Sequence, residues 1–241
     1  MADSVYLPGL AVVEPRCEAA PRHSALVRIT HWINSLSFVA LLVSGIGILL
    51  AHPRFYWGET GGIGTPSLFD LPLPFMLGGP SGWGRYLHFQ SAWLCVLNGI
   101  VYVTSGVAGR HVGVNLMPAR RDLAWTSLRR SIVSHLRFQR PAADEALTYN
   151  VLQRISYLAV IFILFPLLLW TGLAMSPAVT SVFPGLVTVL GGHQCARTIH
   201  FFAAIASVLF VAVHLIMVWR AGFRGRVAAM IMGRVVPRER S

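Results

Sequence analysis

Four apolar stretches of the chain are long enough to cross a lipid bilayer as helices. They cover residues 29–51, 87–108, 154–175 and 198–219, and nearly all charged residues lie between them. A hydrocarbon core about 30 Å thick needs roughly 20 predominantly apolar helical residues. The pattern therefore predicts an all-α membrane protein, built as a bundle of four transmembrane helices.

Shorter apolar segments are predicted to lie at the membrane surface. Residues 122–138 and 226–236 place apolar side chains among arginines at roughly helical spacing, which is typical of amphipathic helices on anionic lipid. Residues 181–192 are too short to span the bilayer. The Gly- and Pro-rich loop at 52–84 either docks a partner or rests on the outer interface as a plain loop.

The distribution of arginine predicts the orientation in the membrane. The chain has 20 basic residues and a net charge of +11, with 55% of its residues hydrophobic. Of the arginines, 17 lie before the first stretch, between the second and third, or after the fourth; Arg54, Arg85 and Arg197 lie on the opposite side. Positively charged loops stay in the cytoplasm, so we expect both termini there. This asymmetry accounts for the charge without nucleic acid as a partner.

We divide the chain into three parts. Residues 1–22 form a cytoplasmic segment without the apolar core of a cleaved signal peptide, so the first span acts as the targeting signal. Residues 23–222 form the membrane domain, and 223–241 form a cytoplasmic tail. The three cysteines form no CxxC pair, and the absence of CxxCH argues against covalently attached haem.

Four histidines lie within or at the start of the predicted spans, in two depth-matched pairs. His200 and His214 are fourteen residues apart, so they share one helix face within about 40° and are separated by about 21 Å along the axis. Because successive spans alternate in direction, His200 has the depth of His88, and His214 has the depth of His31.

Two imidazoles at one depth provide the axial ligands of a b-type haem. The outer haem iron would be bound by His88 and His200, and the inner haem iron by His31 and His214. Zinc fits less well because its sites use three or four protein ligands. Structural, hydrogen-bonded histidines and a proton relay in a transporter are the alternatives that need no cofactor. His193 is a rival to His200 if the last helix begins early.

Three of these histidines follow an arginine in the pattern RxxH. Arg28, Arg85 and Arg197 each lie one helical turn nearer the interface than their histidine, where haem propionates would emerge. Arginines that simply flank membrane helices are the alternative. Gly45 lies fourteen residues after His31, at the outer level, where a missing side chain would admit a macrocycle; ordinary close packing of helices is the alternative.

Several of these residues resemble those of the bacterial cytochrome b561 and nickel-iron hydrogenase b-type cytochrome family. The matching pieces are VRITHW at 27–32, GRYLHF at 84–89 and the last-span histidines with their fourteen-residue spacing. The resemblance covers about residues 23–222 and includes the cytochrome b subunits of formate dehydrogenase and of thiosulfate-reductase-like enzymes. It implies two haem b groups with the same histidine pairing.

The resemblance also implies a function in electron transport in the bacterial inner membrane. We expect a membrane anchor that carries electrons between the quinone pool and a periplasmic partner, either a molybdopterin oxidoreductase or a hydrogenase subunit. The alternative is a stand-alone cytochrome b561 that oxidises a small periplasmic reductant such as superoxide. Polar residues where the third span begins are candidates for a quinone site, or for ordinary interfacial anchoring: Tyr149, Asn150, Gln153, Arg154 and Tyr157.

Overall fold

The computed structural model describes residues 24–62, 64–72, 82–108 and 151–233, and this part of the chain is mostly helical. The predicted amphipathic segment 122–138 lies outside the described residues. The elements follow one another as α1 (Ala25–Ala51), β1 (Arg54–Phe55), β2 (Phe69–Asp70), α2 (Gly82–Ala108), α4 (Val151–Ala159), η4 (Val160–Leu164), α5 (Phe165–Ala174), α6 (Pro177–Thr180), α7 (Gly185–Thr188), α8 (His193–Arg220) and α9 (Phe223–Met232).

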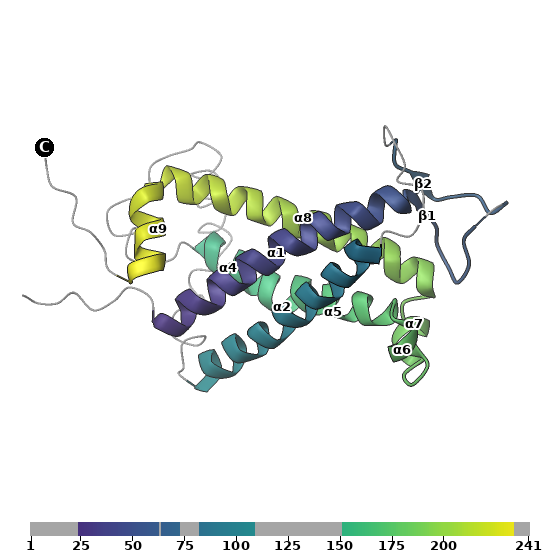
Figure 1. Cartoon of the computed structure of the whole chain (residues 1–241), viewed down its shortest axis with the longest axis horizontal. Coiled ribbons are helices and arrows are strands. Elements are labelled where there is room, and N and C mark those ends of the chain that lie inside the picture. The colour runs from purple at the N-terminus through teal and green to yellow at the C-terminus, as the bar shows by residue number, and fades with distance from the viewer. Residues whose placement is uncertain (1–23, 63, 73–81, 109–150, 234–241) are drawn as a thin grey trace, which may run out of the picture.

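Three described helical segments are long and apolar enough to cross a membrane: Ala25–Ala51, Ile155–Ala174 and His193–Arg220. Each contains most of a stretch that the sequence predicted to be a span, so the helical class is confirmed and these three helices are candidate membrane spans. The fourth predicted stretch lies in α2, which has 27 residues, the same length as α1. α2 packs along α1 (Figure 1).

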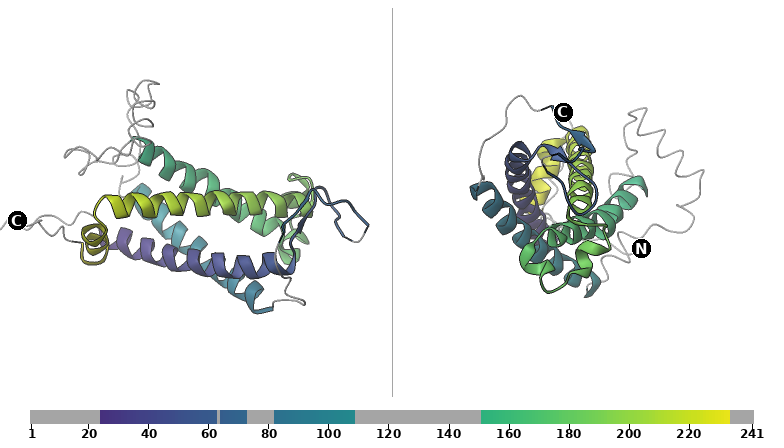
Figure 2. Two further views of the ribbon diagram at one scale, coloured as in Figure 1. Left: turned by 90° about the horizontal axis from the view of Figure 1, so that it is seen from above. Right: turned by 90° about the vertical axis from the view of Figure 1, so that its right-hand side faces the viewer.

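The long helices run side by side with alternating direction, so the bundle has two distinct ends (Figure 2). At one end lie the strands β1 and β2 together with α6 and α7; we call it the hairpin end. At the other end lies α9, and we call it the α9 end. The start of α1 and the end of α8 lie at the α9 end, whereas the starts of α2 and α8 lie at the hairpin end (Figure 1).

An amide side chain holds α2 at a defined depth against α1. The Asn98 Nδ2 group donates to the Thr30 carbonyl oxygen and to Asn34 Oδ1, both at 2.8 Å. Asn98 is 7% exposed and Thr30 is 3% exposed. In lipid such an interhelical hydrogen bond is favoured because the alternative is an unsatisfied polar group in hydrocarbon. It therefore fixes how far α2 slides along α1.

The third apolar helix contains a π-helical turn, η4. The Phe165 N–H donates to the Val160 carbonyl oxygen, an i to i−5 bond. Pro166 follows directly, and proline has no N–H to continue the i to i−4 ladder. Helices commonly deform beside a proline or at a π turn. The turn changes the rotation of α5 relative to α4.

The described part of the 52–84 loop forms a short hairpin that docks on α8. Arg54 pairs with Asp70, and Phe55 pairs with Phe69. The Phe55 ring is 2% exposed and lies 4.8 Å from the Phe69 ring and 4.5 Å from the Phe201 ring, measured between centroids. The sequence did not predict these two-residue strands, because their pairing depends on the aromatic contact with α8.

Two hydrogen bonds to carbonyl oxygens of the same loop join it to the start of α8. Thr198 Oγ1 donates to the Tyr56 carbonyl oxygen at 2.9 Å, and the Gln194 N–H donates to the Gly58 carbonyl oxygen at 3.0 Å. The chain passes so close to this carbonyl that a Cβ atom on Gly192 would lie 2.5 Å from it. The loop therefore sets where α8 begins and how it is rotated.

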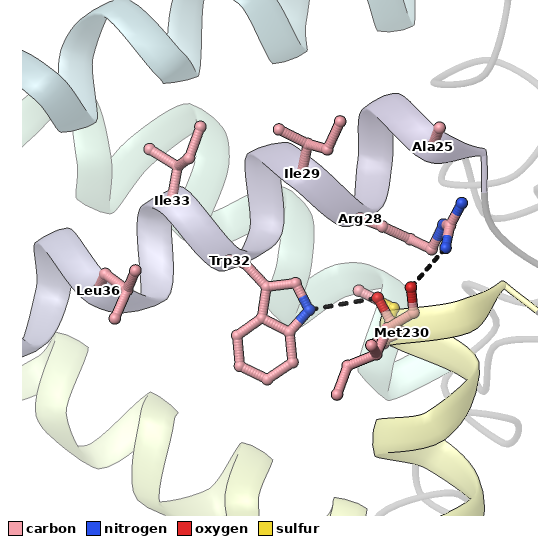
Figure 3. A pocket seen from close by; sticks show the side chains of 8 residues that line it. Ala25, Arg28, Ile29, Trp32, Ile33, Leu36 and Met230 are labelled. Carbon is pink, nitrogen blue, oxygen red and sulfur yellow. Dashed lines mark hydrogen bonds between the residues drawn. The ribbon is translucent and has the colours of Figure 1, made fainter.

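At the opposite end, α9 is joined to α1. Arg28 Nη1 donates to the Ile231 carbonyl oxygen at 2.6 Å, and Trp32 Nε1 donates to the Met230 carbonyl oxygen at 3.2 Å (Figure 3). These carbonyls belong to the last turn of α9, where a cation also complements the helix dipole. α9 begins within the predicted cytoplasmic tail and includes part of the segment expected to be amphipathic.

We predict that Gly192→Ala destabilises the protein. Gly192 has φ 114° and ψ 171°, a region that is essentially restricted to glycine, and the new methyl group would also collide with the Gly58 carbonyl. Such a residue costs about 1–3 kcal/mol. The melting temperature of the detergent-solubilised protein should fall. Gly185→Ala is the matched control, because nothing lies within 4 Å of its added Cβ; equal melting temperatures for both variants would contradict the prediction.

Candidate functional site

The fold brings the four predicted histidines together in the two expected pairs. His88 from α2 and His200 from α8 have ring centroids 6.2 Å apart, with an angle of 63° between the ring planes. His31 from α1 and His214 from α8 have centroids 6.3 Å apart, with an angle of 52°. We call them the hairpin-end pair and the α9-end pair. His193 begins α8 and is exposed, and the ring opposite His88 is that of His200.

The separation within each pair fits one metal ion bound between two imidazoles. A transition-metal ion bound by two imidazole nitrogens at about 2 Å each places two opposed ring centroids about 6 Å apart. Among the described residues, no group of three or more His, Cys, Asp or Glu side chains forms a metal site. Among the described residues, each donor set thus consists of two imidazoles, which would suit a haem b better than a zinc ion with its three or four protein ligands.

A buried serine contacts the Nδ1 atom of His88. Ser44 Oγ donates to the Ala40 carbonyl oxygen at 2.6 Å and lies 3.0 Å from His88 Nδ1. A hydroxyl has one proton, so while Ser44 donates to Ala40 it can accept only from the Nδ1–H tautomer of His88. Nε2 is then unprotonated, as a metal ligand requires.

The partner histidine has the same arrangement on another helix. Thr171 Oγ1 donates to the Leu167 carbonyl oxygen at 2.7 Å and lies 2.9 Å from His200 Nδ1. The sequence analysis missed both hydroxyls. The available signal was a Ser-Gly and a Thr-Gly dipeptide at matching depths of two predicted spans.

The glycines of these dipeptides lie beside the imidazoles. A Cβ on Gly45 would lie 3.7 Å from His88 Cε1, and a Cβ on Gly172 would lie 3.8 Å from His200 Cε1. Gly45, which the sequence singled out for the outer level, is thus at the hairpin-end pair. Gly172 is its counterpart on α5. Both keep the helix backbone next to the pair free of side chains.

The α9-end pair has different surroundings. The His31 Nδ1 atom is buried and has no hydrogen-bond partner among the described residues. Aromatic rings surround the two imidazoles: Trp32 lies 5.6 Å from His31, and Tyr157 and Phe210 lie 6.4 Å and 6.1 Å from His214, between centroids. The two pairs therefore share their spacing but differ in the groups that contact the imidazoles.

Cationic side chains gather at the hairpin end. The guanidinium of Arg197 donates to the His52 carbonyl oxygen and lies over the Phe55 ring, 4.9 Å from its centroid. Partial burial lowers the pKa of His52 below its ordinary value, and the charges of Arg197 and Arg85 lower it further. Arg85 is exposed. This arrangement favours an anionic ligand beside the hairpin-end pair. The sequence analysis did not single out His52.

Arg28 lies at the α9 end, where its guanidinium bonds to α9, and its Nε atom is buried without a partner among the described residues. Of the candidate quinone residues, Tyr149 and Asn150 lie outside the described residues, as do the side chains of Gln153 and Arg154. Tyr157 lies beside His214. The predicted polar cluster is thus described only at Tyr157, next to the α9-end pair.

Comparisons with known proteins identify relatives along most of the chain. The prokaryotic cytochrome b561 family matches residues 22–233. A putative protein-methionine-sulfoxide reductase subunit YedZ1 of Azospira oryzae is 31% identical over 201 residues, which cover 81% of this chain and 89% of that protein. A probable Ni/Fe-hydrogenase B-type cytochrome subunit of Cupriavidus necator is 24% identical over 226 residues, which cover 88% of this chain and 84% of that protein. The cytochrome b556(fdo) subunit of formate dehydrogenase of Escherichia coli is 27% identical over 223 residues, which cover 91% of this chain and 87% of that protein. No solved structure matches significantly.

We predict that His52 makes the folded protein less stable in mild acid. Because its pKa is lowered in the folded state, the unfolded chain takes up a proton first as the pH falls below about 6.5. Stability is therefore lost below that pH. His52→Gln removes this contribution, so the melting temperature should fall less between about pH 7 and pH 5 than in the wild type. His193→Gln, an exposed histidine at the start of α8, is the control; an identical pH dependence for His52→Gln and wild type would refute the prediction.

Proposed function

The chain belongs to the prokaryotic cytochrome b561 family, and we propose on this basis that it is a membrane electron-transfer subunit that binds two haem b groups. The observation that carries the proposal is the presence of two imidazole pairs with centroids 6.2 Å and 6.3 Å apart, one near each end of the bundle. Both lie within apolar helices, where titratable side chains are uncommon and usually functional.

The residues of the chain have separate roles in this proposal. His88 and His200 hold one haem, and His31 and His214 hold the other. When bound, the haems supply one-electron redox chemistry, which the protein tunes through ligands, hydrogen bonds and burial. Arg85 and Arg197 bind carboxylate groups at the hairpin end, and Arg28 does so at the α9 end through donors such as its unpartnered Nε. Gly45 and Gly172 leave the space beside the hairpin-end pair open.

We further propose that α2 is a fourth span, that both termini are cytoplasmic and that the protein lies in the bacterial inner membrane. The arginine distribution supports this orientation. The hairpin end then faces the periplasm, and the α9 end faces the cytoplasm. The hairpin-end pair is accordingly the outer site, and the α9-end pair is the inner site.

The relatives support a role in a larger oxidoreductase. Three of them are described as subunits, of a methionine-sulfoxide reductase, a Ni/Fe-hydrogenase and a formate dehydrogenase. We propose that this chain carries electrons between a periplasmic oxidoreductase and quinone. The exposed Trp57, Leu68 and Phe183 side chains at the hairpin end offer apolar surface to such a partner. Quinone would bind near the α9-end pair, where Tyr157 lies.

We predict that His200→Ala and His214→Ala each remove a different haem. Each variant deletes one imidazole of one pair, so the purified protein should retain about half of the wild-type haem. Redox-titrated visible spectra should show the loss of one component in His200→Ala and of the other in His214→Ala. His193→Ala is the control, since this exposed residue lies outside both pairs. A wild-type protein with fewer than two haems per chain would refute the proposal.

We predict that the purified chain reduces or oxidises quinone rapidly only when an oxidoreductase partner is present. The partner would supply the enzyme active site from which electrons enter or leave this chain. The test is affinity purification from the native membrane, followed by quinone-dependent activity with and without the co-purified subunit. Full activity of the chain alone with a small reductant such as superoxide would instead favour the stand-alone function.

A further inference from the structure

A hydroxyl residue followed by a glycine contacts each histidine of the hairpin-end pair, from two different helices. Ser44-Gly45 on α1 contacts His88, and Thr171-Gly172 on α5 contacts His200. In each case the hydroxyl lies within 3.0 Å of Nδ1, and the glycine that follows faces Cε1. Ser44 is 0% exposed and Thr171 is 0% exposed, so neither hydroxyl serves solvent.

Each hydroxyl uses its proton within its own helix and can therefore only accept a hydrogen bond from its histidine. The Ser44 proton is directed to the Ala40 carbonyl oxygen, and the Thr171 proton to the Leu167 carbonyl oxygen, both four residues earlier in the same helix. The oxygen lone pairs then face Nδ1–H. Among the described residues, the α9-end pair has no equivalent contact at His31 Nδ1.

We propose that Ser44 and Thr171 are positioning residues that fix the Nδ1–H tautomer of His88 and His200 and thereby lower the reduction potential of the hairpin-end haem. The inference rests on the proposed function. A hydrogen bond from the distal N–H of a ligating imidazole raises the basicity of the ligand, which stabilises the oxidised metal. Within the described part of the chain, His31 Nδ1 has no such hydroxyl contact, so we expect the two haems to differ in potential.

The test is a spectroelectrochemical titration of the full-length, haem-loaded protein. Ser44→Ala and Thr171→Val remove one hydroxyl each and leave both imidazoles of the pair in place, so haem should be retained. We expect each variant to favour the reduced hairpin-end haem by up to about tenfold, which is about 59 mV for a one-electron couple. The component is identified by its absence in His200→Ala, and the other component should not move.

Conservative and matched variants separate hydrogen bonding from packing. Thr171→Ser keeps the hydroxyl and should retain the wild-type potential. Thr104→Val is the control, because Thr104 Oγ1 donates to the Ile100 carbonyl oxygen at 2.7 Å in the same way but has no histidine partner among the described residues; it should shift neither component. If Thr171→Val loses the haem, Thr171→Ser still decides the question.

Unchanged hairpin-end potentials in Ser44→Ala and Thr171→Val would overturn the inference, as would a shift in Thr171→Ser equal to that in Thr171→Val. The failure of the proposed function gives a different result, because the wild type would then lack two bis-histidine haem components. A wild type with both components and hydroxyl variants without a shift would leave the proposed function intact and reject the positioning role alone.

Discussion

A single helix, α8, supplies one imidazole to each pair, and both pairs depend on its depth and rotation. His200 and His214 are fourteen residues apart, close to four full helical turns, so they face the same side about 21 Å apart. A rotation of α8 would move both imidazoles away from their partners together. The rest of the fold can be understood as a set of contacts that hold α8, α1 and α2 in matching registers.

Those contacts lie at defined places. The hairpin packs Phe55 against Phe201 of α8, and Thr198 donates to the Tyr56 carbonyl, so the loop after α1 fixes where α8 starts. Asn98 fixes α2 against α1 through Thr30 and Asn34. Polar bonds are effective here because few apolar contacts distinguish one helix register from another within lipid.

The two pairs are alike in spacing and unlike in environment. Buried hydroxyls contact the hairpin-end pair, and cationic groups lie nearby, whereas Trp32, Tyr157 and Phe210 surround the α9-end pair. Hydrogen bonds and local charge are the main means by which a protein tunes a haem. One scaffold thus provides two imidazole pairs with different surroundings, so the two haems of the proposed function would be tuned by different groups.

The sequence by itself determined the helical membrane class, the family and the four histidines in their two pairs, because span length and fourteen-residue spacing are properties of one helix at a time. His52, Ser44, Thr171 and Gly172 were missed as site residues since their importance depends on which helix they contact. The sequence also did not predict the hairpin or the hydrogen bond between Arg28 and α9. Only the tertiary structure decided them, because contacts between distant segments depend on helix rotation and on the π turn before Pro166, which hydrophobic periodicity does not specify.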